Sequence, residues 1–172
     1  MKRYLCDGIV KGATHQRNGL PCQDSKKIVE ISDDIVIIAV ADGHGSEKCP
    51  RSDRGSTIAV NTFCEVMKNY LQSYGSDENG LSNLITFLNR EGDMRFAQDI
   101  CEEWQARVKQ SYYKKKEEGM LDDDGNIKWS SVYSLYGTTL LGMLITNSFV
   151  FSFQIGDGDI NLVTEDGVFA LV

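Results

Sequence analysis

The sequence lacks the segments that direct a chain into or across a membrane. No run approaches the roughly 18 consecutive apolar residues that span a bilayer. The stretch that follows Lys2 and Arg3 contains no apolar run long enough for a signal peptide. Proline is also scarce, with two residues in 172, in a chain of otherwise globular composition. We therefore expect a cytoplasmic protein with no membrane partner.

An excess of basic charge is absent too. The chain has 18 lysines and arginines against 25 aspartates and glutamates, a net charge of −7 and a pI near 4.8. Sequence-independent nucleic-acid binding needs a basic surface, so we expect no nucleic-acid partner. The five cysteines are irregularly spaced and form no Cys-x-x-Cys pair. This pattern indicates free thiols rather than a zinc site or a disulfide framework.

The length of 172 residues and the 41% hydrophobic content predict one domain over residues 1–172. Apolar periodicity predicts strands, then helices, then strands, which is typical of an α+β fold with a mostly antiparallel sheet. We expect a weakly patterned strand over 4–11, a loop over 12–23, and a helix capped by Ser52 or Asp53. The other expected elements are strands over 27–31, 35–41, 139–146, 149–155, 160–164 and 168–172, and helices around 81–88 and 96–114.

The most informative stretch is the strand over 35–41, which runs directly into Asp42-Gly43-His44-Gly45. Its unbroken apolar, β-branched sequence predicts a strand buried on both faces. A carboxylate and an imidazole at the end of such a strand are costly unless they pair, bind a metal or carry out chemistry. The alternative is a polar turn, because Asp-Gly often ends a strand.

Two further acidic positions lie at strand ends, Asp24 after Gln23 and Asp157 between Gly156 and Gly158. A hairpin around 32–34 would bring Asp24 and Asp42 to the same edge of the sheet. Carboxylates and a backbone carbonyl are the ligands that Mg²⁺ and Mn²⁺ prefer. The sequence therefore predicts a metal site at this edge.

These segments resemble those of the metal-dependent protein phosphatases of the protein phosphatase 2C family, particularly its bacterial branch. The motifs that carry the resemblance, in order, are Gly12-Ala13-Thr14-His15 with Pro21-Cys22-Gln23-Asp24, Ala39-Val40-Ala41-Asp42-Gly43-His44-Gly45, Tyr136-Gly137-Thr138-Thr139-Leu140 and Gln154-Ile155-Gly156-Asp157-Gly158. The resemblance extends over essentially the whole chain. It implies an antiparallel β-sandwich flanked by helices, and a hydrolase acting on phosphorylated serine and threonine in protein substrates.

The resemblance also implies roles for individual residues. Asp42 would bridge two Mg²⁺ or Mn²⁺ ions together with the Gly43 carbonyl, and Asp24 would hold the second ion directly or through water. A metal-bridged hydroxide would hydrolyse the phosphomonoester. His44 matches the position of a general acid toward the leaving oxygen, and Asp157 matches a further metal position.

The chain departs from the family pattern in its first loop and at Asp157. The family has an arginine in this loop that binds phosphate, whereas here His15 lies nearer that place and Arg17 follows two residues later. A guanidinium binds phosphate bidentately, which favours Arg17 slightly, but an exposed loop arginine is the equal alternative. No Ser-Arg follows Gly156-Asp157-Gly158, so a plain turn remains the alternative for Asp157.

Two aspartate motifs that the family places downstream, Asp-Gly and Asp-Asn, have no match here, because Asp166-Gly167 follows too closely on Asp157. The missing motifs and the apolar end of the chain together predict that these 172 residues are the N-terminal portion of a longer phosphatase. The phosphatase domain is then incomplete in this chain. We expect the 172-residue piece alone to be nearly inactive. The alternative is a non-catalytic phosphatase-like module that binds a partner through the same cleft; the oligomeric state is left open.

Overall fold

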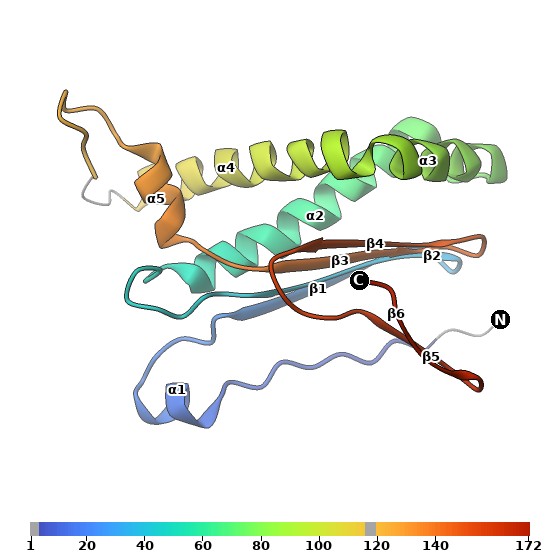
Figure 1. The fold of residues 1–172 in the computed structure, drawn as a ribbon, viewed down its shortest axis with the longest axis horizontal. Helices are drawn as coiled ribbons and strands as arrows, with labels where there is room; N and C mark the ends of the chain where they lie inside the picture. The colour runs from blue at the N-terminus through green and yellow to red at the C-terminus, as the bar shows by residue number, and fades with distance from the viewer. Residues whose placement is uncertain (1–3, 116–119) are drawn as a thin grey trace.

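The computed structural model describes residues 4–115 and 120–172. A four-stranded antiparallel sheet has the order β1-β2-β3-β4, and helices cover one of its faces (Figure 1). A two-stranded sheet and the N-terminal segment lie beyond the opposite face (Figure 1). The strands are β1 (Asp24–Ser32), β2 (Ile35–Asp42), β3 (Leu140–Ile145), β4 (Val150–Ile155), β5 (Asn161–Thr164) and β6 (Gly167–Ala170). The helices are α1 (Ala13–Arg17), α2 (Ser52–Tyr74), α3 (Glu78–Glu91), the π-helix η1 (Gly92–Phe96), α4 (Ala97–Lys114) and α5 (Trp129–Leu135).

Successive side chains along each strand point to opposite faces of the sheet, and the face with the buried apolar side chains meets the helices. Ile37 of β2 pairs with Leu144 of β3, and Leu144 pairs with Phe151 of β4, so the three side chains form one row across the sheet. Ile37 and Leu144 are completely buried, and this row belongs to the main core. On the other face Val40 is 44% exposed and Val150 is 48% exposed. The α+β class with an antiparallel sheet and flanking helices is therefore confirmed, although the sheet is not closed in the residues described.

Helix α2 lies across the sheet because its apolar residues recur on one side. Phe63 and Met67, four residues apart, are completely buried against the strands. The Phe63 ring stacks on Phe153 of β4, with 5.9 Å between ring centroids, and meets Phe96 edge to face at 6.0 Å. These aromatic contacts tie α2, the π-helix and β4 into one core.

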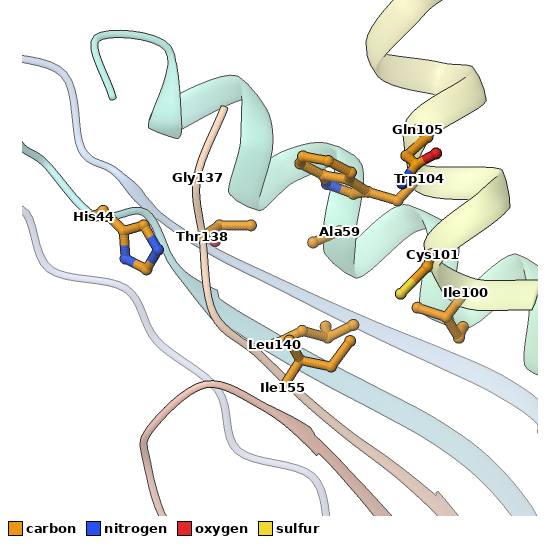
Figure 2. A pocket seen from close by; sticks show the side chains of 10 residues that line it. All are labelled: His44, Ala59, Ile100, Cys101, Trp104, Gln105, Gly137, Thr138, Leu140 and Ile155. Carbon is orange, nitrogen blue, oxygen red and sulfur yellow. The ribbon is translucent and has the colours of Figure 1, made fainter. Parts of the chain in front are cut away.

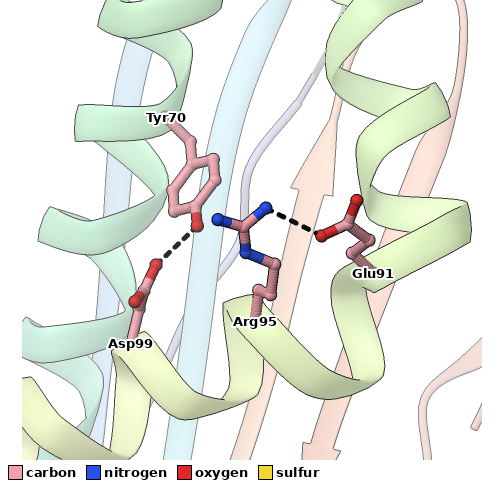
Figure 3. Close-up of polar contacts among 4 residues, drawn as sticks. All are labelled: Tyr70, Glu91, Arg95 and Asp99. Carbon is pink, nitrogen blue, oxygen red and sulfur yellow. Dashed lines mark hydrogen bonds and ion pairs between the residues drawn. The ribbon is translucent and has the colours of Figure 1, made fainter.

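The π-helix joins α3 to α4 at the Glu91-Gly92-Asp93 interruption in the apolar pattern. Arg95 donates to Glu91 at 2.9 Å, and the Tyr70 hydroxyl of α2 donates to Asp99 at 2.5 Å (Figure 3). Phe96, at the end of the π-helix, is completely buried. The wider turn of the π-helix therefore directs Phe96 into the core. The Arg95–Glu91 and Tyr70–Asp99 contacts hold the side of this turn that faces away from the core.

Several sequence expectations were wrong in detail. The segment 4–11 forms no strand, and the expected loop over 12–23 contains the short helix α1. Arg51 is the N-cap residue of α2, and Ser52 instead accepts a hydrogen bond from the Gly45 amide at 3.2 Å. Helix α5 was not anticipated, because seven residues are too short to show a helical period. The remaining strands and the helices around 81–88 and 96–114 are confirmed to within a few residues.

No helix within residues 4–115 and 120–172 is both long and apolar enough to cross a membrane.

Candidate functional site

The site is built around two aspartates that face each other at the edge of the sheet. Asp24 begins β1 and Asp42 ends β2, and the antiparallel register pairs them directly. The register is set by the turn after Ser32 and by an irregularity between Glu30 and Ser32. The hairpin predicted from the sequence therefore forms and brings the two carboxylates to one edge.

A third carboxylate, Asp157, lies in the turn that follows β4. Asp24, Asp42 and Asp157 line the same cavity of about 380 Å³. Its wall also includes part of the N-terminal segment, where Asp7 forms an ion pair with Lys26 at 2.6 Å. The structure thus brings together three of the acidic positions that the sequence singled out.

The electrostatics of Asp42 reflect this crowding of negative charge. Partial burial raises the pKa of Asp42 above its usual value, and the charge of Asp24 and a hydrogen bond with it raise it further. The charge of Asp157 adds to this rise in the pKa, while His44 opposes it. Asp42 remains solvent-accessible, so its carboxylate lies in a cavity wall and is not enclosed in the core. Repulsion between neighbouring carboxylates of this kind favours a bound cation.

The two threonines directly before β3 hold the backbone of Asp42 in place. The Thr139 amide donates to the Asp42 carbonyl at 2.8 Å, and the Asp42 amide donates to the Thr139 hydroxyl at 3.1 Å. The Thr138 hydroxyl donates to the same carbonyl at 2.9 Å. No role was predicted for these threonines from the sequence beyond their place in the Tyr136-Gly137-Thr138-Thr139-Leu140 motif. A Thr-Thr pair directly before an apolar strand was the available signal, because hydroxyls at strand ends bond to backbone groups.

Gly43 and His44 continue from Asp42 into the loop that leads to α2. Gly43 is buried, its amide donates to the Gln23 carbonyl at 3.1 Å, and it forms a bridge with Thr138. The His44 amide donates to the Gly137 carbonyl at 3.1 Å, while the residue as a whole is exposed. Its side chain lines a second, smaller cavity that is distinct from the one lined by the aspartates (Figure 2). His44 is thus held by its backbone beside the acidic cavity.

The two residues considered for phosphate binding lie apart from this group. His15 and Arg17 belong to α1, which lies below the sheet in Figure 1, on the side away from α2, α3 and α4. The Arg17 guanidinium donates to the Ala13 carbonyl within its own helix at 3.3 Å. Neither residue lines the cavity that Asp24 and Asp42 share. The structure therefore does not bring them to the carboxylates.

A comparison with protein-family models identifies the fold. The model described as Protein phosphatase 2C matches residues 11–172, nearly the whole chain. The chain belongs to the protein phosphatase 2C family. No curated protein and no solved structure matches it.

The metal chemistry that this family membership implies fits the donors of this chain in part. In the part of the chain that the structure describes, no group of three or more His, Cys, Asp or Glu side chains is arranged to hold a metal ion. Mg²⁺ is usually held by one or two carboxylates, with water completing its shell. The facing pair Asp24 and Asp42 satisfies that requirement for one ion. A complete centre for two ions is not assembled by the described residues of this protein phosphatase 2C domain.

Proposed function

We propose that this chain is a metal-dependent serine/threonine protein phosphatase that hydrolyses phosphomonoesters. The observation that carries the proposal is the register pairing of Asp24 with Asp42, with the charge of Asp157 acting on the same carboxylate. A carboxylate whose pKa is raised by two neighbouring carboxylates is a candidate for a functional cation site rather than for a structural turn. Membership of the protein phosphatase 2C family supports the reaction class.

Each residue has a defined task in this proposal. Asp24 and Asp42 would hold Mg²⁺ or Mn²⁺ at this end of the β1–β2 hairpin. A bound cation supplies charge neutralisation for the phosphoryl oxygens and lowers the pKa of a coordinated water. The bonds from Thr138 and Thr139 keep the Asp42 backbone from moving as charge develops. His44, two residues after Asp42, donates a proton to the leaving serine or threonine oxygen.

The activity test measures release of p-nitrophenol from p-nitrophenyl phosphate, and of phosphate from a phosphothreonine peptide, with added Mn²⁺. We expect slow turnover that EDTA abolishes, and loss of that turnover in Asp42→Asn. Asp166→Asn is the matched control, because Asp166 is an exposed aspartate in the turn between β5 and β6. Turnover that survives Asp42→Asn would refute the proposal.

A second function, a non-catalytic module that binds phosphoprotein, is favoured by the incomplete ligand set among the described residues. Isothermal titration with Mn²⁺ separates the two functions. Binding that Asp24→Asn and Asp42→Asn each abolish supports the enzyme. Absence of Mn²⁺ binding, together with retained affinity for a phosphothreonine peptide, supports the module.

A further inference from the structure

The cavity lined by the three aspartates also contains a lysine to which the proposed reaction gives no task. Lys26 of β1 lines this cavity together with Asp24, Asp42 and Asp157. Among the described residues that form the cavity wall, Lys26 is the one with a basic side chain. A phosphate ester that enters the cavity would therefore meet one cationic side chain of the chain itself.

Strand alternation places the Lys26 side chain on the same face of the sheet as that of Asp24. Residues two apart on a strand point to one side, about 6.5 Å from each other along the strand. The next lysine, Lys27, points the other way, because its ammonium donates to Asn61 Oδ1 of α2 at 2.6 Å. Lys26, opposite Val40 in the register, therefore faces away from the helices, next to the carboxylate pair.

This position suits a group that binds the phosphate of a substrate. The four-carbon stem of lysine is flexible and ends in an ammonium with three donors, which binds phosphate as a point charge. A phosphate ester held at the Asp24–Asp42 edge would lie within reach of this ammonium. His15 and Arg17, the residues considered for this task from the sequence, do not line the cavity.

The Lys26 ammonium already binds a carboxylate of the chain. Asp7, in the N-terminal segment, forms an ion pair with it at 2.6 Å. The next three residues, 8–10, line the cavity, so the segment runs along its wall. The Asp7 carboxylate thus occupies the donor that a phosphate oxygen would use.

The ion pair is weak enough for a phosphate to displace Asp7. The Lys26 side chain is 29% exposed and that of Asp7 is 49% exposed, and exposed ion pairs contribute little to stability. A carboxylate carries one negative charge, whereas a phosphomonoester carries about −1.5 to −2 at pH 7. A substrate phosphate therefore competes with Asp7 for the ammonium.

We propose that Lys26 is the phosphate-binding residue of this site, and that Asp7 of the N-terminal segment competes with the substrate phosphate for it. The inference rests on the proposed phosphatase function and adds a binding residue and an internal competitor to it. Removing the ammonium should weaken substrate binding about tenfold or more. Removing the charge of Asp7 should strengthen substrate binding about two- to fivefold.

The test measures KM and kcat, with added Mn²⁺, for p-nitrophenyl phosphate and a phosphothreonine peptide, because both substrates present a phosphate group. Lys26→Met should raise KM about tenfold or more for both and change kcat less, since the ammonium binds the phosphate before and during the reaction. Lys128→Met is the matched control, because Lys128 is exposed and lies outside the cavity. An unchanged KM in Lys26→Met overturns the inference.

A double variant separates competition by Asp7 from a general effect of its charge. Asp7→Asn should lower KM about two- to fivefold when Lys26 is present and leave it unchanged in the Lys26→Met background. Asp166→Asn, which also removes one exposed negative charge, should leave KM unchanged. No decrease in KM, or an equal decrease in both backgrounds, overturns the competition.

A labelling measurement separates failure of this inference from failure of the phosphatase function. N-hydroxysuccinimidyl acetate acetylates free lysine side chains, and peptide mass spectrometry gives the rate at each lysine, with Mg²⁺ present and at constant ionic strength. If neither substrate is hydrolysed, the phosphatase proposal fails and labelling alone decides the role of Lys26. Inorganic phosphate that slows acetylation of Lys26, but not of Lys128, supports phosphate binding by Lys26. Equal rates at Lys26 with and without phosphate overturn it.

Discussion

Gly137 lies so close to His44 that a side chain at Gly137 would collide with the imidazole. A Cβ atom built on Gly137 falls 2.6 Å from His44 Cδ2 and 3.0 Å from Cys49 Sγ. The Gly137 carbonyl also accepts the hydrogen bond from the His44 amide. The glycine thus sets both the backbone and the side-chain position of the proposed general acid.

Gly137→Ala should therefore displace the imidazole and lower turnover of the phosphothreonine peptide by about tenfold to hundredfold. Mn²⁺ affinity should be unchanged, because the carboxylates of Asp24 and Asp42 come from the β1–β2 hairpin. Steady-state kinetics and Mn²⁺ titration on the same sample measure both quantities. Gly12→Ala is the control, since nothing lies within 4 Å of a Cβ at that position. Wild-type turnover in Gly137→Ala would show that the position of His44 does not matter for the reaction.

Asp42→Asn should raise the free energy of unfolding without metal and should remove the stabilisation that Mn²⁺ gives. Without metal, the substitution removes a negative charge that faces Asp24 and Asp157, the same charges that raise the pKa of Asp42. Because the group is accessible and screened, we expect a gain of at most about 1 kcal/mol in the free energy of unfolding at pH 7. The stabilisation that Mn²⁺ gives the wild type should disappear in the variant.

Urea unfolding with and without Mn²⁺ measures both effects, with Asp166→Asn as the reference. A loss of metal-free stability in Asp42→Asn would mean that the carboxylate is held by favourable contacts instead of being repelled by its neighbours.

The contact between α2 and the segment before β3 depends on a second glycine. A Cβ on Gly55 would lie 1.8 Å from the Tyr136 carbonyl oxygen, a backbone atom in a buried part of the chain. Gly55→Ala must separate the two segments, and overpacking of this kind costs about 1–3 kcal/mol or more. The lowered urea midpoint should come with a changed near-UV signal from Trp104, whose indole bonds to the Gly55 carbonyl. A midpoint equal to that of Gly12→Ala would contradict the close approach.

Much of the fold was predictable because its signals are local. The apolar run at 35–41 predicts a buried strand, and the short turn after Ser32 predicts its partner, so the pairing of Asp24 with Asp42 followed from two adjacent elements. The π-helix and α5 were not predictable in the same way. Gly92 interrupts the period without showing that the helix continues with a wider turn, and seven residues of α5 are fixed by tertiary contacts such as those of Val132.

The site residues that belong to sequence motifs could be predicted. The features of the site that depend on tertiary packing could not. Asp24, Asp42 and Asp157 could be named from acidic residues at strand ends, and the structure brings them to one cavity. The positions of His15 and Arg17 could not be predicted, because a loop with two glycines does not determine where α1 lies. The smaller cavity beside His44 was likewise hidden, since Trp104 and Ile155 are 51 positions apart in the sequence and meet only through the packing of α4 on the sheet.

The hydrogen bond between Tyr70 and Asp99 predicts a specific response of stability to alkaline pH (Figure 3). Partial burial raises the pKa of the Tyr70 hydroxyl well above its usual value, and the hydrogen bond to Asp99 and its charge raise it further. The folded chain therefore keeps this proton at pH values where the unfolded chain, with a pKa of about 10, has lost it. The contribution of Tyr70 is complete below about pH 10 and falls as the pH rises above that value.

Tyr70→Phe should lose about 1 kcal/mol of unfolding free energy at pH 8, because the bond to a carboxylate is removed at a partly exposed site. Its loss of stability between about pH 10 and 11 should be smaller than that of the wild type, so the two curves converge. Urea unfolding at a series of pH values measures the difference, and Tyr113→Phe, at a tyrosine that is 60% exposed, is the control. Parallel curves for wild type and Tyr70→Phe would mean that Tyr70 ionises equally readily in the folded and unfolded chains, and that Asp99 does not hold its proton.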